Sequence, residues 1–123
     1  MGRILIADDE AKILEVMKDI LEGEGHQVVA VSDGETALRW LQSDRFDVAL
    51  IDVMMPRMDG YHVAAAVRAL ENPPKIIIVT ARDYKTDKEA IHASGADAFL
   101  PKPFATKDLI EVVKNLIAEK SKS

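Results

Sequence analysis

Five polar side chains in this sequence have types and spacing that suit metal binding and phosphate chemistry. Each lies at or just beyond the end of a short apolar run: Asp8, Asp9, Asp52, Thr80 and Lys102. The first run leads directly into three acids, in the stretch ILIADDE at residues 4–10. A carboxylate at the end of a buried strand is costly unless a positive group meets it. We therefore expect these acids to share a positive partner.

The charges of these side chains favour a divalent cation as that partner. Two carboxylates about 4 Å apart repel each other by about 4 kcal/mol at an effective dielectric constant of 20, and one lysine does not balance three acids. Oxygen ligands that leave positions for water and phosphate are typical of a Mg²⁺ site. A lysine and a threonine can then bind phosphoryl oxygens, and a carboxylate beside the metal can accept the phosphoryl group. The residues favour Mg²⁺-dependent phosphoryl transfer to a carboxylate.

Each side chain also has an ordinary explanation when it is taken alone. Asp8 and Asp9 suit the first turn of a helix, and Asp52 suits a turn. Thr80 suits the end of a strand, and a lone lysine such as Lys102 is usually a solvated loop residue. What favours a shared site is that all five occupy equivalent places after separate apolar runs.

Five apolar runs predict the strands that position these residues. The runs are residues 3–7, 27–31, 47–51, 75–79 and 98–100. They are continuous rather than alternating, which is typical of strands buried on both faces of a parallel sheet. The intervening stretches carry apolar residues at helical spacing, the first including Ile13 and Met17 and the third extending to Leu70. This alternation predicts an α/β domain with helices on both faces, in which the carboxyl ends of the strands form the ligand-binding edge.

Composition limits the classes of protein that this chain can represent. Its 123 residues suit one domain, and 48% hydrophobic with 30% charged residues is typical of globular proteins. The absence of cysteine excludes disulfides and thiolate chemistry. The formal net charge of −5 argues against direct nucleic-acid binding by this segment. Without an apolar run of membrane-spanning length or a signal peptide, we expect no membrane association and a cytoplasmic location.

Four pieces of the sequence together resemble the receiver domain of bacterial two-component response regulators, of the chemotaxis-regulator and sporulation-relay type. In chain order they are ILIADDE, DVALIDVMMPRMDG, IIIVTA and GADAFLPKPF. The resemblance covers essentially the whole chain. It implies a doubly wound (βα)5 flavodoxin-like fold, with a five-stranded parallel sheet of order 2-1-3-4-5 and helices on both faces. We expect residues 1–120 to form the receiver (response regulatory) domain and residues 121–123 to be a polar tail or the start of a linker.

The resemblance implies a Mg²⁺ site and a modified residue. Asp52 would be the aspartate that is phosphorylated. Asp9 would be the direct acidic metal ligand, and Asp8 would hold the metal partly through water. The backbone carbonyl of Met54 would complete the protein's share of the coordination. By the same resemblance, Met54 and Arg82 would line the approach of water to the phosphoryl group and tune its lifetime.

The resemblance also implies a switch. Lys102 would contact a phosphoryl oxygen and the Asp52 carboxylate, and Thr80 would contact another phosphoryl oxygen. Phe99 falls at the position of the family's switch aromatic residue and would turn inward as Thr80 is drawn toward the phosphoryl group. The Lys102–Pro103 bond is expected to be cis, a form that is rare except before proline.

The function implied by the resemblance is that of a phosphoacceptor signalling switch. A sensor histidine kinase or a histidine phosphotransfer protein would donate the phosphoryl group, and the chain would catalyse only its own phosphorylation and dephosphorylation. The face formed by the fourth helix, fifth strand and fifth helix would control an unknown output partner or effector domain, and could also form a homodimer. The broad apolar arc of the first helix leaves Ile13 and Val16 as a surface for a kinase helix.

Two other functions are compatible with parts of the sequence. A small Mg²⁺-dependent phosphatase with an aspartate nucleophile, of the haloacid dehalogenase type, also uses acids at strand ends. Such an enzyme needs an Asp-x-Asp motif after its first strand, whereas this chain has Asp8-Asp9-Glu10. A binding module that acts without phosphorylation would not need the complete set of acids together with Thr80 and Lys102. Both alternatives therefore explain fewer of the residues.

Overall fold

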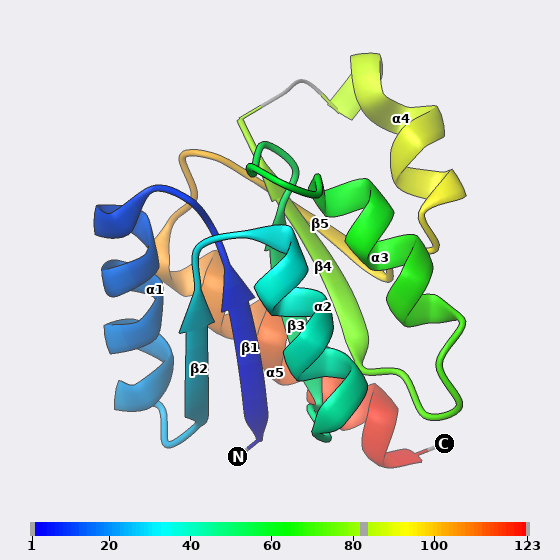
Figure 1. Ribbon diagram of the computed structural model, residues 1–123. Helices are drawn as coiled ribbons and strands as arrows, with labels where there is room; N and C mark the ends of the chain where they lie inside the picture. Colours follow the sequence, from blue (N-terminus) through cyan, green and yellow to red (C-terminus); the bar gives the residue numbers. More distant parts are fainter. Residues whose placement is uncertain (1, 82–83, 123) are drawn as a thin grey trace.

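The continuous apolar runs form one parallel sheet, as predicted (Figure 1). The structure is a computed structural model that describes residues 2–81 and 84–122, with the backbone alone described at 84–86 and 121–122. Its strands are β1 (Arg3–Ala7), β2 (Gln27–Val31), β3 (Val48–Asp52), β4 (Lys75–Thr80) and β5 (Ala98–Pro101). The strand order is β2-β1-β3-β4-β5 and every neighbouring pair is parallel. The expected α/β fold and strand order are confirmed.

Five helices connect the strands in the described part of the chain. They are α1 (Ala11–Gly23), α2 (Gly34–Ser43), α3 (Gly60–Arg68), α4 (Tyr84–Ala93) and α5 (Thr106–Lys122). Aspartates begin two of them, because Asp33 accepts from the N–H of Thr36 and Asp59 accepts from the N–H of His62. Among the described residues, no helix combines the length and the apolar character needed to cross a bilayer.

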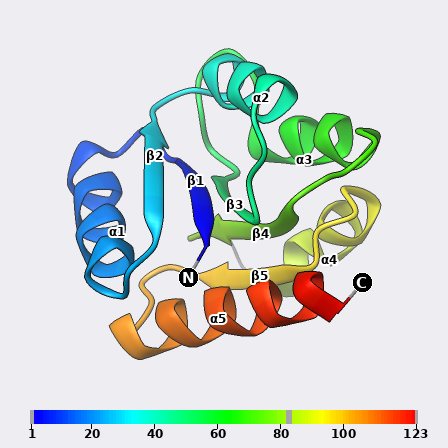
Figure 2. The same ribbon diagram turned by 90° about the horizontal axis from the view of Figure 1, so that it is seen from below.

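Helices cover both faces of the sheet and bury two separate apolar layers. On one face, Met17 and Leu21 of α1 and Leu109 of α5 pack against β1, β3 and β4 (Figure 2). On the other face, α2 and α3 pack against the alternate residues of the same strands, and α4 lies beside α3. Because helices cover both faces of the sheet, the side chains on both faces of β1 and β3 are buried, and this explains why these two sequences are continuously apolar.

Three strands end one residue later than the sequence pattern predicts. β3 covers Val48–Asp52 rather than 47–51, and β4 and β5 include Thr80 and Pro101. At the start of β3, the carboxylate of Asp47 instead accepts a hydrogen bond from the N–H of Arg3 at 2.7 Å. Asp52 and Thr80 are therefore the last residues of their strands, and the ladder itself fixes their backbone.

The third helix is shorter than its apolar pattern suggests. Leu70 lies beyond the last residue of α3, Arg68, and its N–H bonds to the carbonyl of Val67. Its side chain nevertheless packs against the same apolar layer as α3. The apolar pattern therefore predicted the packing of Leu70 correctly, whereas the helix ends at Arg68, before the turn that leads to Asn72-Pro73-Pro74.

Candidate metal and phosphoryl site

The register of the sheet places the polar strand ends side by side. Ala7 is level with Ile51 of β3, and Asp52 is level with Val79 of β4. Thr80 in turn is level with Pro101 of β5. Because Asp8 follows Ala7 and Lys102 follows Pro101, one edge of the sheet receives polar side chains from four parts of the chain.

Lys102 lies at the centre of this edge. Its ammonium Nζ is 2.7 Å from Asp8 Oδ2, 3.3 Å from Asp52 Oδ2 and 3.4 Å from Glu10 Oε1. The lysine side chain is only 8% exposed. Three carboxylates therefore surround one ammonium, which supplies three N–H donors.

Asp8 is the most enclosed acid of the group. It is fully buried, its Oδ2 accepts from the Lys102 ammonium, and its Oδ1 accepts from the N–H of Glu10 at 2.9 Å. A carboxylate removed from water is tolerated when both oxygens have partners. Asp8 thus joins the start of α1 to the loop that follows β5.

Asp52 is also buried but has a poorer set of partners. Its Oδ1 accepts only a long bond of 3.4 Å from the N–H of Met54, and its Oδ2 is 3.3 Å from Lys102 Nζ. Burial and the neighbouring charge of Asp8 raise the pKa of Asp52 to about 6, although Lys102 opposes the increase. The Asp52 carboxylate is therefore the group in this cluster that would gain from a further cation.

The same charges act on Lys102 in the opposite sense. Burial alone would lower the pKa of the ammonium, but the hydrogen bond that it donates to Asp8 and the charges of Asp52 and Asp8 raise it above its usual value. Lys102 is accordingly charged throughout the physiological pH range. Its positive charge is a fixed feature of the site.

The loop after β3 packs tightly against Asp52. The N–H of Gly60 bonds to the carbonyl of Val53 at 3.0 Å, and a Cβ on Gly60 would lie 2.3 Å from the carbonyl oxygen of Asp52. Only glycine fits this approach. Within the loop, Met58 N–H bonds to the Pro56 carbonyl across Arg57, which has a positive φ of 71°.

Thr80 and Phe99 lie on the same face of the sheet. Thr80 is fully buried and lies two residues after Ile78 on β4, so the two side chains point to the same face, and the register partner of Ile78 on β5 is Phe99. Phe99 is half-buried against the apolar layer that contains Ile78. The Lys102–Pro103 peptide that follows is cis, as the resemblance implied. Arg82 lies outside the described residues.

The structure brings together a different set of acids from the one emphasised in the sequence. Asp8, Glu10 and Asp52 each place a carboxylate oxygen within 4.8 Å of the others, whereas Asp9 is exposed and is not part of this group. Met54 contributes its backbone N–H to Asp52, while its side chain is 61% exposed. Glu10 had no assigned role. Its spacing of two residues from Asp8 was the signal that could have identified it.

The donor set fits a Mg²⁺ ion. Among the residues that the structure describes, three carboxylates supply hard oxygen ligands and one ammonium lies among them, which leaves an excess of negative charge in this group. The raised pKa of Asp52 indicates the electrostatic cost that a divalent cation would relieve. Asp8 and Asp52, both buried, are the acids best placed to hold it.

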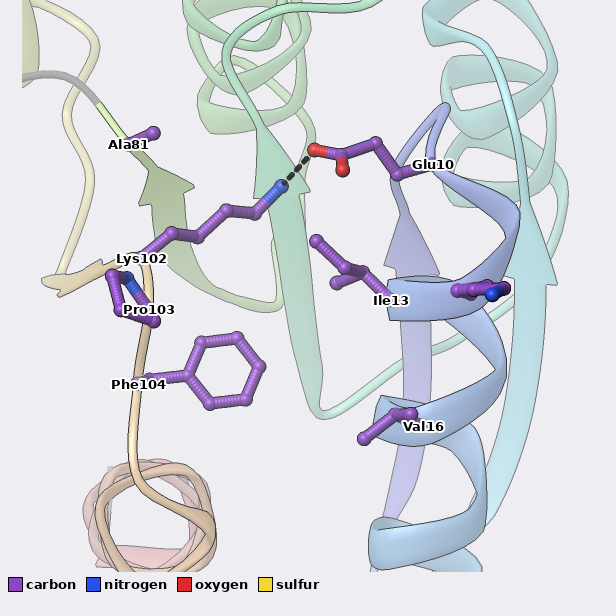
Figure 3. A pocket seen from close by; sticks show the side chains of 8 residues that line it. Glu10, Ile13, Val16, Ala81, Lys102, Pro103 and Phe104 are labelled. Carbon is purple, nitrogen blue, oxygen red and sulfur yellow. Dashed lines mark hydrogen bonds and ion pairs between the residues drawn. The ribbon is translucent and has the colours of Figure 1, made fainter.

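An apolar groove of about 460 Å³ begins beside the site, between α1 and the loop that leads into α5. Figure 3 shows Glu10 and Lys102 at one end of the groove, with Ile13 and Val16 facing Phe104 across it. Val16 is 51% exposed. The site and an accessible apolar surface are therefore contiguous.

Comparisons with known proteins give a consistent result. The family model described as the response regulator receiver domain matches residues 4–114. Curated relatives called response regulator MprA, from Mycolicibacterium vanbaalenii and Mycobacterium ulcerans, are 38% identical over 115 residues. That alignment covers 94% of this chain and 50% of each relative. The chain spans about half the length of these curated relatives.

Solved structures with the same fold include several receiver domains. A CheY-like receiver domain protein from Methanospirillum hungatei has a TM-score of 0.91 at 32% identity, covering 99% of this chain and 98% of its own. The receiver domain of a sensor histidine kinase from Pseudomonas aeruginosa, with a magnesium ion coordinated in its active-site cleft, has a TM-score of 0.89 at 31% identity, covering 95% and 98%. TrrA from Thermotoga maritima, in complex with Mg²⁺ and BeF, has a TM-score of 0.85 at 35% identity, covering 94% and 99%.

Proposed function

Because this chain belongs to the response regulator receiver domain family of two-component signalling, we propose that Asp52 accepts a phosphoryl group in a Mg²⁺-dependent reaction. The donor is a phosphohistidine on a sensor histidine kinase or on a histidine phosphotransfer protein. The carboxylate oxygen of Asp52 attacks phosphorus, the P–N bond to the donor histidine breaks, and an aspartyl phosphate forms. The chain catalyses this transfer and the later hydrolysis of its own aspartyl phosphate.

The observation that supports this proposal best is the convergence of Asp8, Asp52 and Lys102. These residues come from the ends of three different strands, and one ammonium contacts both buried carboxylates within 3.3 Å. A fixed ammonium beside a nucleophilic carboxylate can bind a phosphoryl oxygen as charge develops on it. Such a site needs little further chemistry beyond positioning and charge.

Mg²⁺ is the cofactor that we propose for this site. Asp8 and Asp52 would hold it, with Asp9 and the backbone carbonyl of Met54 as the further ligands expected from the family resemblance. When bound, the metal would neutralise charge on the phosphoryl oxygens and on the acids. Lys102 and Thr80 would bind the remaining phosphoryl oxygens. The magnesium ion in the receiver domain from Pseudomonas aeruginosa supports this assignment.

We further propose that phosphorylation acts on the face formed by α4, β5 and α5. Thr80 would move toward the phosphoryl group, and Phe99, on the same face of the sheet, would turn into the space that becomes free. The population would shift between two packings, biased by a few charge-assisted hydrogen bonds. The face would control an output partner or effector domain that is still to be identified, and a homodimer through it is one form of that control. The cytoplasmic location expected from the sequence stays a prediction.

The groove beside α1 is the proposed contact for the phosphohistidine donor. Ile13, Val16 and Phe104 form an apolar wall next to Lys102, so a helix seated there would bring its histidine close to Asp52. The main support is that Val16, which is 51% exposed, belongs to a contiguous apolar groove with Ile13 and Phe104, since a contiguous exposed apolar surface is typical of an interaction site.

Incubation with acetyl phosphate and Mg²⁺ tests the proposal against the phosphatase alternative. The chain should gain one phosphoryl group that is stable enough to detect by native mass spectrometry, and EDTA should prevent this gain. The Asp52→Asn variant should gain none. Repeated turnover of a phosphomonoester such as p-nitrophenyl phosphate, without a stable phosphorylated state, would favour a phosphatase instead.

A further inference from the structure

Glu10 is the N-cap residue of α1, yet its side chain forms no capping hydrogen bond with the helix. Its backbone carbonyl accepts from Leu14 N–H, and its own N–H is bound by Asp8 Oδ1, but no side-chain cap hydrogen bond forms. The carboxylate instead points across the entrance of the groove to Lys102, where Oε1 lies 3.4 Å from Nζ (Figure 3). Glutamate is not one of the residue types that usually cap a helix N-terminus, and the contact of this carboxylate with Lys102 is the interaction that the structure shows for it.

The three partners of the Lys102 ammonium differ in an important way. Asp8 and Asp52 are buried and are the residues assigned above to Mg²⁺, whereas the Glu10 side chain is 61% exposed and lies on the solvent side. A metal held by Asp8 and Asp52 would compete with the ammonium for these two carboxylates. Lys102 would then face a nearby divalent charge with fewer partners. Glu10 is the carboxylate that remains available to it.

We propose that Glu10 is a positioning residue, which holds the Lys102 ammonium in the site when Asp8 and Asp52 turn to the metal. The inference rests on the proposed function, because it concerns how the same site accommodates a metal and a lysine together. Glu10 lowers the repulsion between Lys102 and Mg²⁺, and it keeps the ammonium directed at the phosphoryl position. Loss of its charge therefore weakens metal binding through Lys102 rather than through a lost metal ligand.

The first experiment measures Mg²⁺ affinity by isothermal titration calorimetry. Glu10→Gln should raise the Mg²⁺ dissociation constant about threefold to fivefold, as expected for one partly exposed charged pair. Glu15→Gln, which removes the same charge from an exposed position on the same helix, should change it by less than about twofold. The melting temperature of Glu10→Gln without metal should stay close to that of the wild type. An unchanged dissociation constant for Glu10→Gln would overturn the inference.

A double-mutant cycle separates a positioning role from direct ligation. The same Glu10→Gln change is introduced into two backgrounds without the ammonium, Lys102→Met and Lys102→Gln, so that one background suffices if the other does not fold. If Glu10 acts through Lys102, its effect on Mg²⁺ affinity falls to about twofold or less in these backgrounds. An effect as large as in the wild type would identify Glu10 as a metal ligand and contradict the inference. A wild-type chain that did not bind Mg²⁺ at all would overturn the proposed metal site itself.

Discussion

The Nζ atom of Lys102 lies 2.7 Å from Oδ2 of Asp8, although 94 residues separate the two in the sequence. This pair links the residue that follows β1 to the residue that follows β5 across the edge of the sheet where the strands end. It also leaves Asp52 as the less well compensated acid, because its contact with the same ammonium is longer, at 3.3 Å. The difference between the two carboxylates leads to the first two predictions.

Asp52→Asn should raise the melting temperature in EDTA. The folded-state pKa of Asp52 is raised to about 6, so ionised Asp52 destabilises the fold above that pH. A rise of this pKa from 3.8 to about 6 corresponds to about 2–3 kcal/mol, which is several degrees in melting temperature for a domain of this size. Thermal unfolding at pH 7.5 measures the change, and Asn can still accept from Lys102.

The pH dependence of this gain provides its control. As the pH falls through 6 toward 4, the folded wild type takes up a proton on Asp52 before the unfolded chain does, and its deficit disappears. The difference in melting temperature between the two proteins should therefore shrink on acidification. An Asp52→Asn variant that melts below the wild type at pH 7.5 would show that charge at Asp52 does not destabilise the site.

Mg²⁺ binding should weaken at acidic pH. Below a pKa of about 6, protons compete with the metal for Asp52, whereas Lys102 stays charged because its own pKa is raised. Titration calorimetry at pH 7.5 and pH 5.5 should show about a fourfold loss of affinity. Asp44→Asn, a change at an acid paired with Arg3 away from the site, should keep the same dependence. Equal affinity at the two pH values would mean that Asp52 is not a ligand.

Arg57→Gly should stabilise the domain. Arg57 has a positive φ of 71° at the centre of a three-residue turn, a conformation that costs a non-glycine residue about 1 kcal/mol. The ion pair lost with Glu35 is long, at 3.9 Å, and exposed, and contributes little. Urea unfolding should therefore show a gain of about 0.5–1 kcal/mol. A loss of stability would indicate that the Arg57 side chain makes a larger contribution than its contacts suggest.

Val16→Gln should slow phosphotransfer from a histidine kinase while leaving phosphorylation by acetyl phosphate unchanged. The side chain is 51% exposed and lines the groove, so its apolar surface is available to a protein donor but does not reach the acids. Loss of that contact should reduce the rate about fivefold with a kinase that phosphorylates the wild type. The small-molecule donor is the control. An equal decrease with both donors would place the effect in the site rather than in docking.

The fold was predictable because burial is visible in the sequence. Continuous apolar runs identified all five strands, and the order of polar strand ends placed Asp8, Asp52 and Lys102 at one edge. The predicted strand ends were one residue too early, because Asp52 and Thr80 are polar but still pair with the neighbouring strands. An apolar run in the sequence therefore ends at the first polar residue, although that residue can still pair with the neighbouring strand.

The arrangement within the site was less predictable. The sequence presents Asp8, Asp9 and Glu10 as one acidic run, and only the backbone at the start of α1 decides which of them face the site. That backbone turns Asp9 outward and brings Glu10 to Lys102, a contact across 92 residues. The positive φ of Arg57 was equally hidden, since arginine gives no local signal for that conformation.

The most direct test of the phosphoacceptor assignment is to map the modified residue. After reaction with acetyl phosphate and Mg²⁺, borohydride reduction converts a phosphorylated aspartate into homoserine, and peptide mass spectrometry locates it. We expect homoserine at position 52 alone, and none in the Asp52→Asn variant or after treatment with EDTA. Homoserine at another aspartate, or a phosphorylated Asp52→Asn variant, would contradict the account.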